Sequence, residues 1–183
     1  MKKTMLQLSA CLLIFIFISP SLHAQADHVS NINDGFALNP NADRDVNMVA
    51  DFMQAFLVDK DFDKARQYFK PDGIDYGPGY GDSANVDQMI QMQQKLDSTV
   101  TNWNIQYFVK FSVSVKDGNQ KGDWVLLWGN ISSENKSGKT ITVPFNSVFK
   151  IEDEKIAMEV DYYDNMSIVK QLGYTITPPT EGQ

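Results

Sequence analysis

The chain has 183 residues, a formal net charge of −7, two histidines and one cysteine. Nucleic acid and anionic membranes are poor partners for an acidic surface, because both require clustered positive charge. So few histidines and cysteines also exclude Ser-His-Asp or Cys-His nucleophile sites and the usual zinc or copper sites.

Residues 1–26 have the three parts of a secretory signal peptide. Lys2 and Lys3 precede an apolar run from Leu12 to Ile18, and the small residues Ala24-Gln25-Ala26 follow. The run falls short of the roughly 20 apolar residues that span a bilayer, which argues against a retained anchor. We predict that the protein is exported by a bacterium to the periplasm or the medium, with no membrane segment after cleavage.

Cleavage after Ala26 changes the charge and removes the only cysteine. The mature chain keeps 14 lysines and arginines against 23 acidic residues, a net charge of −9. Leu8-Ser9-Ala10-Cys11 is similar to a lipobox, but the most apolar residues come after the cysteine rather than before it. Disulfides therefore cannot stabilise the mature domain.

The mature chain divides into three predicted parts. Residues 27–42 are rich in Asn, Asp and Ser and predict a flexible leader, and residues 175–183 predict a flexible tail. Residues 43–174 have the length and patterning of one domain with its own core.

Two helices are predicted at the start of the domain. Apolar residues recur at helical spacing in the first: Val46, Val49, Phe52, Met53, Phe56 and Leu57. Asp43 or Asp45 can cap it, and Asp61 can cap the second helix, which Pro71 and Gly73 should end. Residues 75–81 then predict a glycine-rich loop or short strand, and a third helix should start near Ser83 or Asn85.

After residue 101 the apolar period changes from helix to strand. Residues 105–115 alternate with a period of two, and further strands are expected over 124–131, 141–149 and 156–163. A short helix over 165–172 should close the domain, with Gly173 at its end. Helices followed by an antiparallel meander predict the α+β class.

The first strand is unusually long. Residues 104–116 would span roughly 43 Å at about 3.3 Å per residue. Such a sheet must curve, and Gly129 and Pro144 stand where bulges or kinks are expected. We predict a cone: a strongly curved sheet covered by the N-terminal helices, with a central pocket.

Several motifs support a family resemblance over residues 43–174. They are Lys155-Ile156, then Asp161-Tyr162-Tyr163-Asp164-Asn165, then Gln171-Leu172-Gly173, together with the strand 143–150. These motifs resemble the closing strands and helix of the SnoaL-like families of the nuclear-transport-factor-two superfamily. The resemblance implies the cone fold and a homodimer, but the superfamily includes cyclases, isomerases, dehydratases, epoxide hydrolases and non-catalytic members.

The resemblance departs from the family at histidine. Catalytic members often place a histidine in the cone, whereas the mature chain has only His28, in the leader. Chemistry here would therefore rest on carboxylates and phenols. A calcium loop starting at Asp59 fails because Lys64 and Lys70 occupy the positions of its glycine and glutamate. We expect no metal and no other cofactor.

Asp161 is the best candidate for a general base. It shares one strand face with Glu159 and Tyr163, and burial in an apolar cone would raise its pKa. Asp164 is the second, tentative catalytic candidate. The expected pocket-lining residues are Tyr76, Tyr80, Trp103, Tyr107, Trp128 and Tyr163.

Each candidate has a structural alternative. The Asp161 face could instead point to solvent or a dimer partner, paired with a lysine such as Lys150. Asp164 fits a helix N-cap better than a catalyst. The alternative for Asp75 and Tyr76 is that they simply shape a turn. Trp128 fits core or interface better than a ligand platform.

Two functions follow. One is a non-catalytic exported domain that binds a small apolar molecule or a partner, which we favour on sequence alone because the histidine is missing. The other is a cofactor-free enzyme, an isomerase, cyclase or dehydratase, with a carboxylate base.

Overall fold

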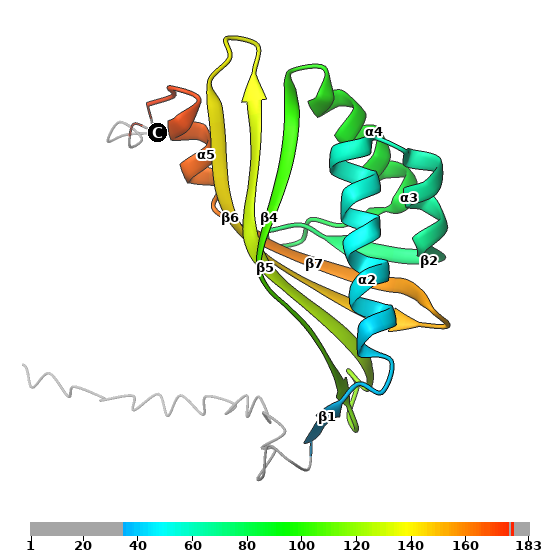
Figure 1. Cartoon of the computed structure of the whole chain (residues 1–183). Coiled ribbons are helices and arrows are strands. Elements are labelled where there is room, and N and C mark those ends of the chain that lie inside the picture. The colour runs from blue at the N-terminus through cyan, green and yellow to red at the C-terminus, as the bar shows by residue number, and fades with distance from the viewer. Residues whose placement is uncertain (1–34, 176, 178–183) are drawn as a thin grey trace, which may run out of the picture.

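A computed structural model of the chain describes residues 35–175 and 177. The predicted signal peptide, the first half of the leader and most of the tail lie outside these residues. The described part forms one seven-stranded sheet in the order β1-β4-β5-β6-β7-β2-β3, with helices α2 to α4 lying across one side of it (Figure 1). The predicted α+β class is confirmed.

The predicted helices are present. They are α2 (Ala42–Met53), which continues into a π-helical turn (Gln54–Asp59), α3 (Phe62–Tyr68), α4 (Val86–Asp97) and α5 (Asn165–Gln171). Asp61 caps α3 by accepting from the Lys64 amide, as predicted, and Asn85 forms a capping box with Gln88 at the start of α4.

The start of α2 differs from the prediction. Asn41, not Asp43 or Asp45, occupies the N-cap position, and its side chain makes no capping hydrogen bond. Asp45 is fully buried and accepts hydrogen bonds from Asn39 (2.7 Å) and Arg44 (2.8 Å). Asn39 also donates to Ser112 on β4 (2.8 Å), so this network ties the helix start to the sheet.

The strands are β1 (Phe36–Leu38), β2 (Phe69–Tyr76), β3 (Ala84–Asn85), β4 (Val100–Val115), β5 (Gly122–Asn135), β6 (Thr140–Glu152) and β7 (Lys155–Tyr163). Strands β4 to β7 form the predicted antiparallel meander. Strand β1 falls within the segment expected to be a flexible leader, and it pairs with the end of β4.

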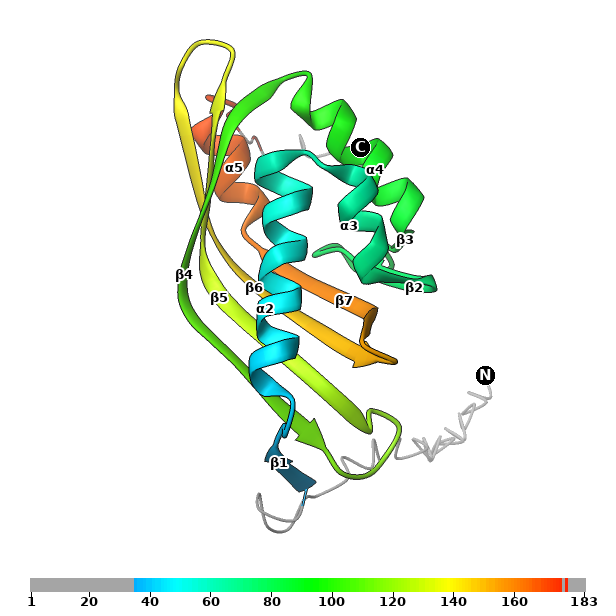
Figure 2. The same cartoon turned by 45° about the vertical axis from the view of Figure 1, so that its right-hand side comes forward.

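The long strands bend strongly, as Figure 2 shows for β4 and β5. The β4–β5 register shifts between Tyr107 and Val109, opposite Gly129. A Cβ at Gly129 would lie 2.2 Å from the Gln106 carbonyl oxygen, so only glycine admits this approach of β4. The bulge is therefore on β4, opposite Gly129 of β5. Pro144 keeps regular pairing with Asn130 and lies before the part of β6 that pairs with β7, where an edge tolerates proline.

Strand β2 was not predicted. Pro71 and Gly73 were expected to end a helix, but they lie inside an edge strand that runs parallel to β7. The β2–β7 register shifts between Phe69 and Ile74, and this irregular stretch contains both residues. The parallel partner is about 80 residues away in sequence, beyond any local pattern.

The core lies between α2, α3, α4 and the concave face of the sheet. Phe52 of α2 is fully buried and contacts Phe69 of β2 and Phe149 of β6, with ring centroids 5.0 and 6.2 Å apart. Side chains thus fill the part of the hollow that lies under α2. Within the described residues, no helix has both the length and the apolar character needed to cross a membrane.

Candidate functional site

The concave face changes character along β6. From one end to the other, the inward residues are Phe149, Ser147, Phe145, Val143 and Ile141, all of them buried. Phe149 belongs to the filled core, and Val143 and Ile141 line an open pocket at the other end. Ser147 is the polar residue between them, and acidic side chains gather beside it.

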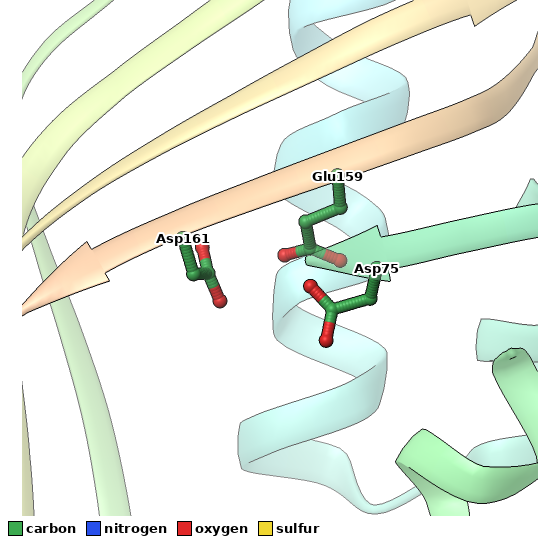
Figure 3. A group of neighbouring side chains, drawn as sticks. All are labelled: Asp75, Glu159 and Asp161. Atoms are coloured by element: carbon green, nitrogen blue, oxygen red, sulfur yellow. The ribbon is translucent and has the colours of Figure 1, made fainter. Parts of the chain in front are cut away.

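Three carboxylates form this acidic cluster, which we call the carboxylate triad: Asp75 of β2 with Glu159 and Asp161 of β7. One oxygen of each lies within 4.8 Å of one oxygen of the other two. Asp75 pairs directly with Glu159 across the parallel β2–β7 ladder, and Asp161 lies two residues farther along the same face of β7. Figure 3 shows the three side chains pointing toward one another.

The triad is poorly satisfied by other side chains. Glu159 is only 3% exposed, and its Oε2 and the Asp75 Oδ1 are buried without a hydrogen-bond partner among the described residues. Ser147, opposite Asp161 on β6, donates a short hydrogen bond to Asp161 Oδ1. Ion pairs found in the described part of the chain all involve other carboxylates.

Burial raises the pKa of every member, and the charge of neighbouring carboxylates adds to this for Asp75 and Glu159. Burial, helped by the charge of Asp161, raises the pKa of Asp75 to about 7. Burial raises the pKa of Asp161 to about 6, against the lowering effect of the Ser147 hydrogen bond. Burial and the charges of Asp161 and Asp75 raise the pKa of Glu159 well above its usual value. Near neutral pH the triad thus contains both acid and base forms.

A phenol lies next to the triad. Tyr163 follows Asp161 on the same face of β7 and pairs with Phe145. Its pKa is raised by partial burial and then by the charges of Asp161, Asp75 and Asp82. Tyr163 remains 38% exposed. A phenol that keeps its proton beside a carboxylate can donate a hydrogen bond to a bound oxygen.

An apolar pocket of about 490 Å³ opens beyond this tyrosine, between the ends of β4, β5 and β6 and helices α4 and α5. Its lining residues are Leu96, Thr99, Val100, Trp103, Ile131, Ser133, Asn135, Ile141, Val143, Ile168, Leu172, Gly173 and Tyr174. The Trp103 indole donates to Asp97 (2.9 Å), which fixes the ring against α4. The volume is in the usual range for a small-molecule site.

The pocket and the triad are neighbours on one face, but they are separate. Val143 in the pocket is four residues from Ser147 beside the triad, which is roughly 13 Å along a strand. Phe145 and its cross-strand neighbour Tyr163 stand between them. The predicted central pocket is therefore displaced toward the open end of the sheet.

The two catalytic candidates have different surroundings. Asp161 points inward and belongs to the triad, and Lys150 pairs with Glu152 instead. Asp164 is exposed and caps α5 by accepting from the Ser167 amide (2.9 Å), in agreement with its structural alternative.

The expected pocket residues are scattered. Trp103 lines the pocket, and Tyr163 lies beside the triad. Tyr107 is on the concave side, and its buried hydroxyl has no partner within residues 35–175. Burial and the charge of Asp51 raise its pKa to about 12. Tyr76 is 41% exposed and Tyr80 is fully exposed. Trp128 stacks on Phe111 at 5.4 Å, outside the pocket.

Sequence reasoning missed Asp75 as a site residue. Its neighbours Pro71, Gly73 and Gly77 indicate a turn, and the parallel pairing that brings it to Glu159 leaves no local trace. The period of two placed Glu159 on the same face as Asp161 but left open whether that face was inside, and Glu159 is the most buried of the three.

Comparison with known proteins is informative at the level of the family. The family model described as SnoaL-like polyketide cyclase matches residues 47–172, which is more than half of the chain. None of the curated proteins compared with the sequence matches it.

Solved structures with the same fold have little sequence identity. An LEH-like epoxide hydrolase of M. tuberculosis is 18% identical with a TM-score of 0.55, covering 73% of this chain and 92% of its own. A Catenulispora acidiphila protein with a ketosteroid isomerase-like fold, solved with trimethylamine, is 17% identical with a TM-score of 0.56, covering 72% and 97%. An NTF2-like protein of Burkholderia pseudomallei is 14% identical with a TM-score of 0.57, covering 72% and 98%. At these identities the likeness shows the fold alone.

Proposed function

The chain belongs to the SnoaL-like polyketide cyclase family, and from this premise we propose that it is a small-molecule enzyme of the isomerase or cyclase type. It moves a proton on a hydrophobic carbonyl compound, using its own carboxylates. The observation that carries the proposal is the carboxylate triad, in which Asp161 has a pKa of about 6 beside Asp75, whose pKa is about 7, and Glu159, whose pKa burial also raises.

The roles follow from the order of proton affinity. At neutral pH the Asp161 carboxylate is largely ionised and can remove a proton from the carbon next to a carbonyl group. The electron pair of that C–H bond moves to the carbonyl oxygen, giving an enolate. Protonated Asp75 and the Tyr163 phenol can donate hydrogen bonds to this oxygen. Return of the proton to another carbon isomerises the substrate, and attack of the enolate on a second carbonyl closes a ring.

The neighbouring pocket would hold the apolar part of the substrate. Its side chains are mainly aliphatic or aromatic, and Trp103 offers a fixed ring face. A substrate that reached from Val143 to Asp161 would have to pass Phe145 and Tyr163. We infer that an elongated, mostly apolar carbonyl compound fits this arrangement.

Proton abstraction can be tested without knowing the natural substrate. Cyclohexanone and acetophenone are incubated in D₂O with the purified protein, and NMR follows deuterium entry next to the carbonyl. We expect the native protein to accelerate exchange and Asp161→Asn to lose this effect. Asp164→Asn is the matched control, because asparagine keeps the N-cap and leaves the triad intact. Equal exchange in the native protein and Asp161→Asn would remove Asp161 as the base.

A second function is supported by the separation of pocket and triad. A non-catalytic domain that binds an apolar molecule needs only the pocket, and the filled core under α2 suits a storage or scaffolding role. Native mass spectrometry of the purified protein would show a retained apolar molecule. If the retained molecule has no carbonyl group and the protein does not accelerate deuterium exchange, the non-catalytic binding function is favoured over the enzyme.

Export and dimerisation are further parts of the proposal. The motif over residues 1–26 supports export, which cell fractionation and N-terminal sequencing of the mature protein would test. Dimerisation is supported by an aromatic surface at Phe111 and Trp128. Phe111 is 37% exposed, and the Trp128 ring stacks on it. In sedimentation experiments the native protein should be a dimer and the Phe111→Lys variant a monomer. A monomeric native protein would contradict the proposed dimer.

A further inference from the structure

We propose that Asp75, Glu159 and Asp161 also form a binding site for a calcium-sized divalent cation, which regulates the proposed proton transfer by occupying the same oxygens. The inference deepens the proposed function, since it concerns the same side chains. It does not depend on turnover, because the cation can be measured with no substrate present.

The spacing of the oxygens fits calcium. Calcium–oxygen distances are about 2.3–2.6 Å, so two oxygens on opposite sides of the ion are about 4.6–5.2 Å apart. One oxygen of each triad member lies within 4.8 Å of the other two. All three can therefore contact one ion without movement of the strands.

The chemistry of the donors also fits a hard cation. The triad and the neighbouring Ser147 hydroxyl supply only oxygen, which calcium and magnesium prefer over softer nitrogen or sulfur ligands. Three carboxylates have six oxygens, enough for most of a calcium coordination shell. A 2+ ion would leave a net charge of −1, where three bare carboxylates have −3.

A second observation points to a ligand here. Glu159 is only 3% exposed, and its side chain points into the cluster. Its Oε2 has no hydrogen-bond partner among the described residues. Asp75 Oδ1 is likewise buried without a hydrogen-bond partner among these residues. A buried carboxylate oxygen is costly unless a donor, a proton or a cation satisfies it. The ion pairs of the described lysines and arginines lie elsewhere.

The backbone holds the donors in place. Asp75 and Glu159 face each other across one rung of the parallel ladder, and Asp161 follows on the same strand. Asp75 and Asp161 are only partly buried, so an ion can reach them from solvent. A bound cation would keep all three groups ionised and would withhold Asp161 from the substrate. Calcium should therefore inhibit proton exchange.

Terbium luminescence tests the site directly. Tb³⁺ replaces Ca²⁺ and is excited through nearby aromatic rings, here Tyr163. EDTA-treated full-length protein is titrated with Tb³⁺ at pH 8, and Ca²⁺ is then added as competitor. Glu159→Gln and the less buried Asp75→Asn should each weaken affinity at least about tenfold. Asp117→Asn, in the exposed turn after β4, removes the same charge and should change affinity less than about twofold.

Four results separate the outcomes. Saturable binding that is lost in both triad variants and kept in Asp117→Asn supports the site. Binding equal in all four proteins means only adventitious attraction to an acidic surface, and it overturns the proposal. Absence of competition by Ca²⁺, with circular dichroism showing folded protein, means that the triad is satisfied by protons only and likewise overturns it. If calcium binds but no ketone exchanges deuterium, the proposed function fails and the cation site stands.

Discussion

Ser147 donates a hydrogen bond to Asp161 across the β6–β7 ladder, and this contact sets Asp161 apart from the other two carboxylates. The bond stabilises the charged form and lowers the Asp161 pKa against the effect of burial, which leaves it at about 6. Asp75 Oδ1 and Glu159 Oε2 have no hydrogen-bond donor among the described residues. Ser147 is thus a positioning residue for the base.

Removing this donor should shift the pH dependence of catalysis. Hydrogen bonds to charged groups contribute about 1.5–3 kcal/mol, so Ser147→Ala should move the acidic limb of the exchange profile upward by about one to two pH units. Exchange at high pH should fall much less. Ser133→Ala, on the same face but in the pocket, is the control. An unshifted limb in Ser147→Ala would show that the hydrogen bond does not tune the base.

The triad should make folding stability fall as pH rises. The pKa values of Asp75 and Asp161 rise from 3.8 in the unfolded chain to about 7 and about 6. The folded state therefore binds more protons in this window, and stability decreases from about pH 4 to pH 7. Partial exposure of Asp75 weakens its share. We expect a loss of about 3 kcal/mol or more, measured by urea unfolding at several pH values.

Glu159→Gln, an isosteric variant, is the matched comparison with the native protein in that pH series. Glu159→Gln keeps the side-chain shape and removes one repelling charge, so its stability should depend less on pH than that of the native protein. At pH 8 it should be the more stable of the two. A native protein that gained stability between pH 4 and pH 7 would falsify the raised pKa values, and Glu134→Gln on β5 controls for the loss of charge elsewhere.

The bend of the sheet depends on Gly129. A Cβ there would lie 2.2 Å from the Gln106 carbonyl oxygen and 2.9 Å from the Phe145 ring, and the backbone contact cannot move away. Gly129→Ala should lower the free energy of unfolding by about 3 kcal/mol or more. Gly77→Ala, whose Cβ would make only an ordinary contact at 3.4 Å with Asp82, should change it by less than about 1 kcal/mol. Urea unfolding of both variants gives the comparison.

Trp103 should dominate the affinity of the pocket for apolar molecules. Burying an aromatic ring face contributes about 1.5–3 kcal/mol, so Trp103→Ala should weaken binding of anilinonaphthalene sulfonate at least about tenfold. Fluorescence titration measures this. Trp124→Ala removes an indole bonded to the Gln120 carbonyl, away from the pocket, and serves as control. Equal weakening by both variants would place the dye outside the pocket.

Local patterns in the sequence determined most of the fold. The helical spacing of Val49 and Phe52 and the period of two along β4 to β7 follow from which side chains must leave water, and both were read correctly. The caps Asp61, Asn85 and Asp164 were also readable, since a side chain that bonds an amide three residues ahead is a local event.

The site was decided by the tertiary structure. Alternation placed Glu159, Asp161 and Tyr163 on one face but could not say whether that face was inside, because either face of a strand fits a period of two. Only the docking of α2 against Phe149 made it the concave side. Asp75 joined the triad through parallel pairing of β2 with β7, a contact between distant segments whose free energy depends on the whole sheet. That pairing adds a third carboxylate to the two that β7 already carries on this face.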